Sequence, residues 1–456
     1  MNPLTVLLMS YYREDTRTLL AIAEELRRVA GVRPLFLIAS EKELREDAAR
    51  AVREAGFEVF DELPDSDMTA GRGVRNPFRR FAIVRETHRR LATRILEQTS
   101  PAAILCTIDA SRNYFIQTAG EMGIPSLYVQ WAEIEGPEFH RAWWSAEASW
   151  SDRSHRPLKR LRRRVVRVID KAAGFGQRWP FFTPTSRLAV AGPHYRDLCI
   201  RAGIPPERIV VTGNVQGDEM YRCARLRADE IAAIKGSLGL AESKRFLLYA
   251  LNDTQRLVHL EPGSAEETER TILTAMRAAQ PGFARVIKLH PKQGDEVSAR
   301  IRAIDPDAVV VGEGWNVGEL VAASSAVVAT VSSVLLWAIG IDRPSISTYL
   351  WRGADEMRMA REWPGVEFAD SYDALVRALK GNIEDPRHLA EWSARRQQGR
   401  DRLQMLDGRG VARIVEALRS LLSEGAARQG RKLSAPVASE VFRSGPAFRN
   451  GPGRQA

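Results

Sequence analysis

Short apolar runs alternate with amphipathic stretches along most of the chain. The runs have the length of buried strands, and the stretches between them repeat apolar positions at helical spacing. This alternation indicates a parallel sheet covered by helices, so the first half is predicted to be a Rossmann-like α/β domain. Its predicted strands are Thr5–Ser10, Pro34–Ala39, Phe57–Phe60, Ala102–Ile108, Pro125–Gln130, Ser186–Gly192 and Arg208–Thr212. Its predicted helices are Thr16–Val29, Glu43–Ala55, Phe78–Gln98, Tyr114–Met122 and His194–Ala202.

The second half repeats the same alternation after a helical linker, Asp229–Leu238. We predict a second Rossmann-like domain there, followed by a mostly helical segment, Pro386–Glu424. The predicted strands are Phe246–Leu251, the apolar part of Arg285–Pro291, Val309–Gly312, Ala326–Val331 and Ser345–Tyr349. The predicted helices are Glu266–Ala279, Val317–Ser325, Val334–Ile341 and Tyr372–Leu379.

The length of 456 residues exceeds what one hydrophobic core supports, which agrees with two domains. We place an N-terminal domain at 1–225, with an insertion at 131–180, and a C-terminal domain at 240–400. A C-terminal helix is expected at 401–424. Residues 425–456 are rich in Gly, Ser, Pro and Arg and are predicted to be disordered.

Composition narrows the class of protein. The sequence contains no apolar run long enough for a transmembrane helix, no signal peptide, and no glycine-rich dinucleotide fingerprint in the turn Ser10–Asp15. Three scattered cysteines fit a reducing cytosol. The net charge of +10 calls for an anionic partner. Nucleic acid is not expected, because no nucleic-acid-binding signature is visible.

Two sequence features follow buried strands of the second domain. Ser332 and Ser333 stand between the strand Ala326–Val331 and a helix, where a hydroxyl either caps the helix or leaves its first N–H groups for an anion. Lys288 and His290 end the strand that Pro291 terminates, although a lone histidine is more often a surface group. Because ligands of such sheets sit at the carboxyl ends of strands, the two features together predict a phosphate site.

These motifs resemble those of known enzymes. Lys288–Pro291 and Thr330–Ser333 are similar to the "HP" and "S/SS" motifs of GT-B-fold glycosyltransferases. Arg208–Asp218 is similar to their "VxGNxxxD" segment, and Asp407–Leu418 to the "DGxxxxRIxxxI" start of their last helix. The resembled proteins are bacterial polysaccharide sialyltransferase-like enzymes, CDP-glycerol glycerophosphotransferases and UDP-GlcNAc 2-epimerases.

The resemblance implies a GT-B architecture, two Rossmann-like parallel-sheet domains facing across a cleft. It further implies a metal-independent transferase with no cofactor, whose substrate is a CMP- or UDP-linked sugar. In the second domain we expect the donor to be bound by Lys288, His290, Thr330, Ser332, Ser333 and Asn252, with His290 also acting in catalysis. The turn Gly213-Asn214 is expected to contribute from the first domain.

An acidic turn is the candidate for the catalytic base. Glu133 and Glu135 lie in Trp131–Arg141, where the resembled enzymes carry a base at a strand end facing the cleft. Either carboxylate could accept the acceptor's proton if burial raises its pKa. The alternative interpretation is a solvated acidic turn.

A basic amphipathic segment follows a cluster of tryptophans. Arg156–Lys171 holds eight basic residues in sixteen positions. This composition is typical of an interfacial helix on an anionic membrane surface, although a solvated helix packed on the domain remains an alternative.

Together these features predict a cytoplasmic enzyme, peripherally attached to the inner face of the plasma membrane. It would transfer a sugar, or a sugar-alcohol phosphate, to a cell-surface polysaccharide such as capsule or lipopolysaccharide, or to a lipid-linked acceptor. The alternatives are a UDP-GlcNAc 2-epimerase-like enzyme and a non-catalytic scaffold in envelope assembly.

Overall fold

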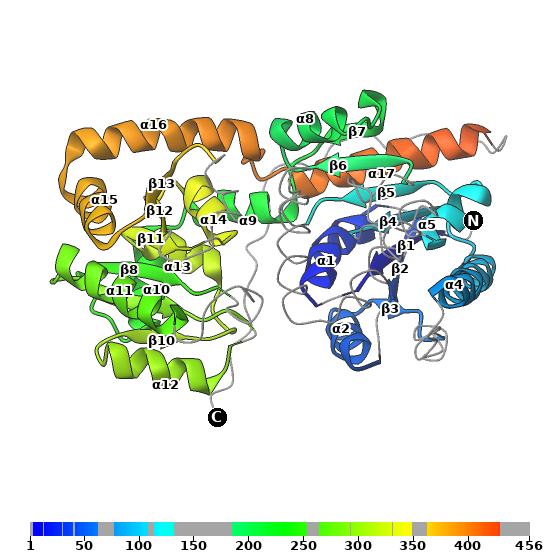
Figure 1. The fold of residues 1–456 in the computed structure, drawn as a ribbon. Coiled ribbons are helices and arrows are strands. Elements are labelled where there is room, and N and C mark those ends of the chain that lie inside the picture. The colour runs from blue at the N-terminus through cyan, green and yellow to red at the C-terminus, as the bar shows by residue number, and fades with distance from the viewer. Residues whose placement is uncertain are drawn as a thin grey trace.

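A computed structural model gives the fold of the chain (Figure 1). It describes residues 3–11, 13–29, 31–39, 42–62, 77–107, 114–131, 185–252, 264–291, 293–330, 332–348 and 363–428. Within these residues the chain forms one seven-stranded and one six-stranded sheet. Every strand pair in both sheets is parallel, which confirms the predicted α/β class.

The first sheet has the strand order β3-β2-β1-β4-β5-β6-β7. Its direction of winding reverses between β1 and β4, the switch point at which α/β sheets bind ligands. The strands are β1 (Leu4–Ser10), β2 (Val32–Ile38), β3 (Glu58–Val59), β4 (Ala103–Cys106), β5 (Ser126–Val129), β6 (Arg187–Val190) and β7 (Ile209–Val211). The helices are α1 (Arg13–Arg27), α2 (Lys42–Glu54), α4 (Pro77–Thr99), α5 (Tyr114–Glu121) and α8 (Pro193–Arg201), with the 3-10 helix η2 (Pro206–Arg208) before β7.

The second sheet repeats this topology in the order β10-β9-β8-β11-β12-β13, with its switch point between β8 and β11. Its strands are β8 (Phe246–Ala250), β9 (Ala284–Lys288), β10 (Val309–Val311), β11 (Ala326–Ala329), β12 (Ser345–Thr348) and β13 (Val366–Ala369). The helices are α9 (Val215–Cys223), α10 (Ala228–Ser237), α11 (Ser264–Ala279), α12 (Asp295–Ile304), α13 (Val317–Ala323), α14 (Val334–Ile341), α15 (Tyr372–Glu384), α16 (Pro386–Leu403) and α17 (Gly410–Arg428).

The sheets form because their strands are buried on both faces. Along β1, Val6 and Leu8 point into the core on one face, and Leu7 and Met9 into the core on the other. All four are at most 2% exposed. Such uninterrupted apolar strands are characteristic of parallel sheets with helices on each side.

The C-terminal helices connect the two domains (Figure 1). α16 packs on α14 and α15 of the second domain and also contacts α8 of the first. The chain then crosses back, and α17 buries Ile414, Leu418 and Leu421 in the core under the first sheet. This spacing of apolar positions is that of an amphipathic helix. α17 ends at Arg428, so its last residues run past the predicted end at residue 424.

The helix α9, which precedes the predicted linker helix (here α10), lies between the domains (Figure 1). Val215 at its start packs against the first core, whereas Met220 and Cys223 belong to a core of the second domain. α9 therefore contributes side chains to the cores of both domains.

Candidate functional site

The candidate site lies at the carboxyl edge of the second sheet. Lys288 is paired with Ala250 in the neighbouring strand β8, and Ala250 with Ala329 in β11. The ends of β9, β8 and β11 are therefore level. Since neighbouring strands are about 4.8 Å apart, the outer two are separated by roughly 10 Å, which a nucleotide-sized ligand spans.

Lys288 supplies a buried cation at this edge. Its side chain is 8% exposed, and Nζ donates a hydrogen bond to the carbonyl oxygen of Leu289 at 3.1 Å. Burial lowers its pKa below the ordinary value, and the carboxylate of Glu313 opposes that shift. Because an ammonium has three donors and its burial is costly, Lys288 is suited to bind an anion.

The two serines have different surroundings. Ser332 is half-buried, and its Oγ accepts a hydrogen bond from the Val334 N–H at 3.3 Å, as a plain helix cap would. Ser333 is exposed and makes no capping bond with its side chain. The hydroxyl of Ser332 therefore caps α14, whereas that of Ser333 lies at the surface beside the start of the helix.

The other predicted residues of the second domain lie at the same edge. Thr330 is buried, its Oγ1 is 3.5 Å from Oγ1 of Thr348, and its carbonyl accepts a hydrogen bond from the Ser347 hydroxyl. His290 is half-buried just beyond β9, and Asn252 just beyond β8. The topology thus brings Asn252, Lys288, His290, Thr330 and Ser332 to one sheet edge at the switch point.

Gly213 and Asn214 lie elsewhere, in a joint with α17. Oδ1 of Asn214 accepts a hydrogen bond from the Gly217 N–H at 2.7 Å and so caps α9. Gly213 has φ +79°, a left-handed conformation that glycine adopts without strain. A Cβ on Gly410, the first residue of α17, would stand 2.8 Å from the carbonyl oxygen of Asn214. The geometry gives both predicted residues a structural role here, and ligand binding by them stays a prediction.

Glu133 and Glu135, the candidate bases, lie outside the described residues. The same holds for the basic segment Arg156–Lys171 and for the rest of the insertion from residue 132 on. Their assignments stay predictions.

A buried polar cluster at the first sheet's switch point was not predicted. Asp15 is 0% exposed, and its Oδ2 accepts hydrogen bonds from the Tyr11 N–H and the Thr107 hydroxyl, both at 2.9 Å. The Thr16 hydroxyl donates to Ser10 Oγ at 2.8 Å. The polar run that follows β1 immediately was the available signal, since polar residues at such a strand end face the ligand edge.

An ion pair joins the carboxyl edges of the two sheets. Arg13 follows β1 and Glu313 follows β10, and the distance between Arg13 NH1 and Glu313 Oε1 is 3.4 Å. The ends of the first sheet's strands thus approach those of the second near Lys288, whose pKa Glu313 also influences.

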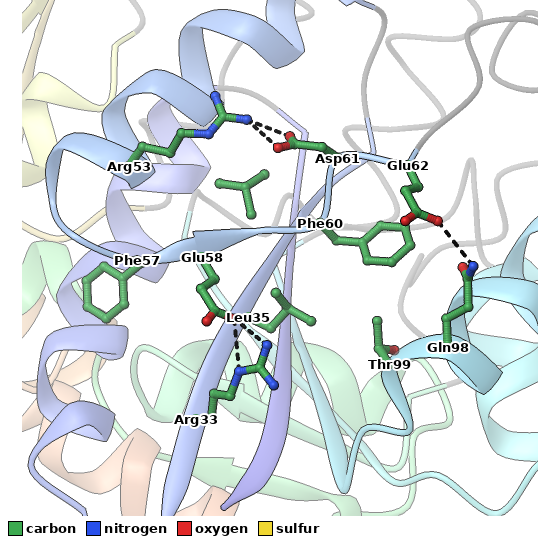
Figure 2. Close-up of a pocket in the computed structure, with 11 residues that line it drawn as sticks. Arg33, Leu35, Arg53, Phe57, Glu58, Phe60, Asp61, Glu62, Gln98 and Thr99 are labelled. Atoms are coloured by element: carbon green, nitrogen blue, oxygen red, sulfur yellow. Dashed lines mark hydrogen bonds and ion pairs between the residues drawn. The ribbon is translucent and has the colours of Figure 1, made fainter.

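A separate pocket of about 540 Å³ lies at the outer edge of the first sheet (Figure 2). Arg33 on β2 contacts Glu58, and Arg53 at the end of α2 contacts Asp61 at 2.6 Å. Leu35, Phe57 and Phe60 supply its apolar part. None of the predicted site residues lines it. Its charged side chains are mostly paired with one another, so we assign the chemistry to the strand ends at the switch points instead.

Among the described residues, no group of three or more His, Cys, Asp or Glu side chains is placed to hold a metal ion. The described helices include none long and apolar enough to cross a membrane.

The overall structure is similar to several solved enzymes. UDP-GlcNAc 2-epimerase from Neisseria meningitidis, solved with UDP-GlcNAc, superposes with a TM-score of 0.56 at 14% identity, covering 91% of this chain and 100% of that one. A glycosyltransferase from Rickettsia africae gives a TM-score of 0.53 at 9% identity, covering 92% and 99%. Anabaena HepE, solved with UDP and glucose, gives 0.51 at 14% identity, covering 92% and 100%.

The chain has the GT-B fold. The two sheets of the chain share one pattern of strand order, and the superpositions cover nearly the whole of each solved structure. These observations confirm the architecture that the motifs implied. No protein-family model and no curated protein sequence matches the chain. Identities of 9–14% establish a common fold and leave the reaction to be argued from the residues of this GT-B protein.

Proposed function

We propose that this GT-B protein is a glycosyltransferase that uses a nucleotide-activated sugar. The observation that carries the proposal is the buried ammonium of Lys288 at the switch point of the second sheet, level with the ends of β8 and β11. Its hydrogen bond to Leu289 leaves donors for a phosphate. The half-buried His290 and the start of α14 lie on the same edge.

The chemistry follows from where charge develops. When the bond between the sugar and the nucleotide breaks, negative charge accumulates on the leaving phosphate. A fixed ammonium and the N–H groups at the start of α14 stabilise that charge more in the transition state than in the bound donor, and so accelerate the step. In the proposed scheme Glu133 or Glu135 accepts the proton of the acceptor hydroxyl.

A screen of donors tests the proposal. UDP-GlcNAc, CMP-sialic acid and CDP-glycerol are each added to the protein while its melting temperature is measured, because a ligand that binds the folded state raises its stability. We expect one of them to raise the melting temperature of the wild type but not of Lys288→Met. Lys235→Met is the matched control, since Lys235 on α10 also donates to a backbone carbonyl, that of Glu242. If no donor raises the melting temperature, or Lys288→Met responds like the wild type, the proposal is wrong.

The epimerase is a second candidate, favoured by the match to UDP-GlcNAc 2-epimerases over their whole length. The two reactions differ in their need for an acceptor. Incubation with UDP-GlcNAc alone gives the C2 epimer if the protein is an epimerase. A transferase instead releases UDP only with an acceptor present.

The acceptor proposed is a cell-surface polysaccharide or a lipid-linked glycan, reached from an anionic membrane surface through Arg156–Lys171. Each nearby basic residue would add about 1 kcal/mol of attraction to such a surface. The protein is expected to sediment with anionic vesicles, and replacement of these arginines by glutamine should release it. Unchanged sedimentation of that variant contradicts the membrane proposal.

A further inference from the structure

Gln293 fastens two strand ends of the candidate site together. Its Oε1 accepts a hydrogen bond from the backbone N–H of His290 at 2.8 Å, and its Nε2 donates to the backbone carbonyl of Asn252 at 2.9 Å. Its own backbone N–H donates to the His290 carbonyl at 2.8 Å, which closes a turn. One amide side chain therefore connects the loop after β9 to the end of β8.

The side chain of Gln293 makes this connection beyond the last paired residues of the two strands. The pairing of β8 with β9 ends at Ala250 and Lys288, and Pro291 has no N–H to donate to a ladder. A primary amide accepts on its oxygen and donates from its nitrogen, as these two partners require. A side chain in such a position restricts the movement of the two backbone segments that it joins.

Asn252 brings a second observation. Its Oδ1 is buried and has no hydrogen-bond partner among the described residues. A buried acceptor without a partner costs free energy that a bound hydroxyl or N–H recovers. Fully ionised phosphate offers only acceptors, so a ligand that satisfies both Lys288 and Asn252 must carry a donor group as well as its anionic group.

We propose that Gln293 is a positioning residue of the donor site, which holds Asn252 and His290 so that the site takes an anion with a hydroxyl or N–H group beside its phosphate. The inference rests on the proposed function, because it concerns the same site. The inference adds a residue, Gln293, that fixes the positions of Asn252 and His290. It also gives a reason that a sugar nucleotide is bound in preference to pyrophosphate.

Three variants test the positioning role. Gln293→Met has a similar shape and loses both side-chain hydrogen bonds, whereas Gln293→Glu still accepts from His290 but cannot donate to Asn252 when ionised. Gln280→Met is the matched control, because Gln280 is a buried amide of the same domain that bonds to Glu384 at 2.7 Å. We expect both Gln293 variants to weaken binding of UDP-GlcNAc, or of CMP-sialic acid if the donor screen selects it, roughly three- to tenfold per hydrogen bond lost. The control should bind like the wild type.

The ratio between two probes separates positioning from general destabilisation. Calorimetric titration with the same sugar nucleotide and with pyrophosphate is carried out on Asn252→Ala and on Gln293→Met. We expect the sugar nucleotide to lose affinity in both variants. The affinity of Asn252→Ala for pyrophosphate should change by less than about twofold, since pyrophosphate offers Asn252 no donor. Gln293→Met also loses the bond to His290 and should lose more affinity for the sugar nucleotide than for pyrophosphate. Equal losses for both probes, or sugar-nucleotide binding at wild-type strength in either variant, overturn the inference. A wild type that binds no sugar nucleotide overturns the proposed function itself.

Discussion

At the scale of single residues, the role proposed for Lys288 predicts that donor binding depends on pH. Burial lowers its pKa from 10.5, so the ammonium loses its proton, and with it the charge proposed to bind a phosphate, at a lower pH than an exposed lysine does. We expect affinity for the donor to fall as the pH rises through the alkaline range. Lys288→Arg should keep its affinity there, because a guanidinium stays charged. Calorimetric titration across that range checks this, and identical profiles for the two proteins would show that Lys288 does not bind the phosphate.

How far the sequence identified the site also depends on single residues. Lys288 and His290 were predicted because an apolar strand ends at them, and strand ends are visible in the sequence. Asp15 was missed although the polar run after β1 was a local signal, because its hydrogen-bond partner Thr107 is ninety-two positions away in the sequence. Gln293 was missed for the same reason, since its partner Asn252 is forty-one positions away.

At the scale of elements, Asp218 of α9 anchors the start of α17 by hydrogen bonds. Its two carboxylate oxygens accept hydrogen bonds from the N–H groups of Gly410 and Val411 at 2.7 and 2.8 Å, at the start of the helix. Asp218→Ala leaves both donors without this acceptor and should reduce the stability of α17 by about 1–2 kcal/mol. Hydrogen exchange of the α17 amides measures the loss. Ser371→Ala removes a comparable cap, from α15, and should leave α17 protected. Equal exchange in α17 for both variants would show that Asp218 is not its anchor.

The helix α9, which carries Asp218, shows why some elements were not predicted. We predicted no helix at Val215–Cys223, and the sequence VQGDEMYRC places a glycine near its start, which lowers helix propensity. The helix forms because Asn214 caps it and because Met220 and Cys223 pack into the second domain. α12 and the edge strand β13 were likewise not predicted. The long, strongly periodic elements were predicted, because the burial of one face leaves a regular spacing of apolar residues in the sequence.

At the scale of the whole molecule, the domains are joined by contacts that sequence patterns do not reveal. The Met405 N–H donates to the carbonyl of Ala191 at 2.9 Å where the chain crosses between α16 and α17. At the carboxyl edges of the two sheets, Arg13 and Glu313 form an exposed ion pair, which contributes at most about 1 kcal/mol to stability. The buried crossover therefore does more than the ion pair to set how the domains sit together.

His194 lies at the contact between α8 and α16 and makes that contact sensitive to acid. Burial lowers its pKa from 6.5 to about 4, and the charges of Arg402 and Arg201 act in the same direction, while Asp197 opposes them. The folded protein therefore holds His194 neutral at a pH where the unfolded chain already protonates it. The stability that this provides is complete above pH 6.5 and is lost as the pH falls through 6.5 towards 4.

The expected loss is about 2 kcal/mol between pH values of about 7.5 and 5, since one pKa unit corresponds to about 1.4 kcal/mol. Urea unfolding at the two pH values measures it. His194→Gln cannot titrate, so the variant should lose less stability than the wild type by this amount, because all other groups titrate alike in both proteins. An equal loss in both proteins would mean that His194 takes up its proton at the same pH in the folded protein as in the unfolded chain. The contact between α8 and α16 would then tolerate a third positive charge beside Arg201 and Arg402, which its burial argues against.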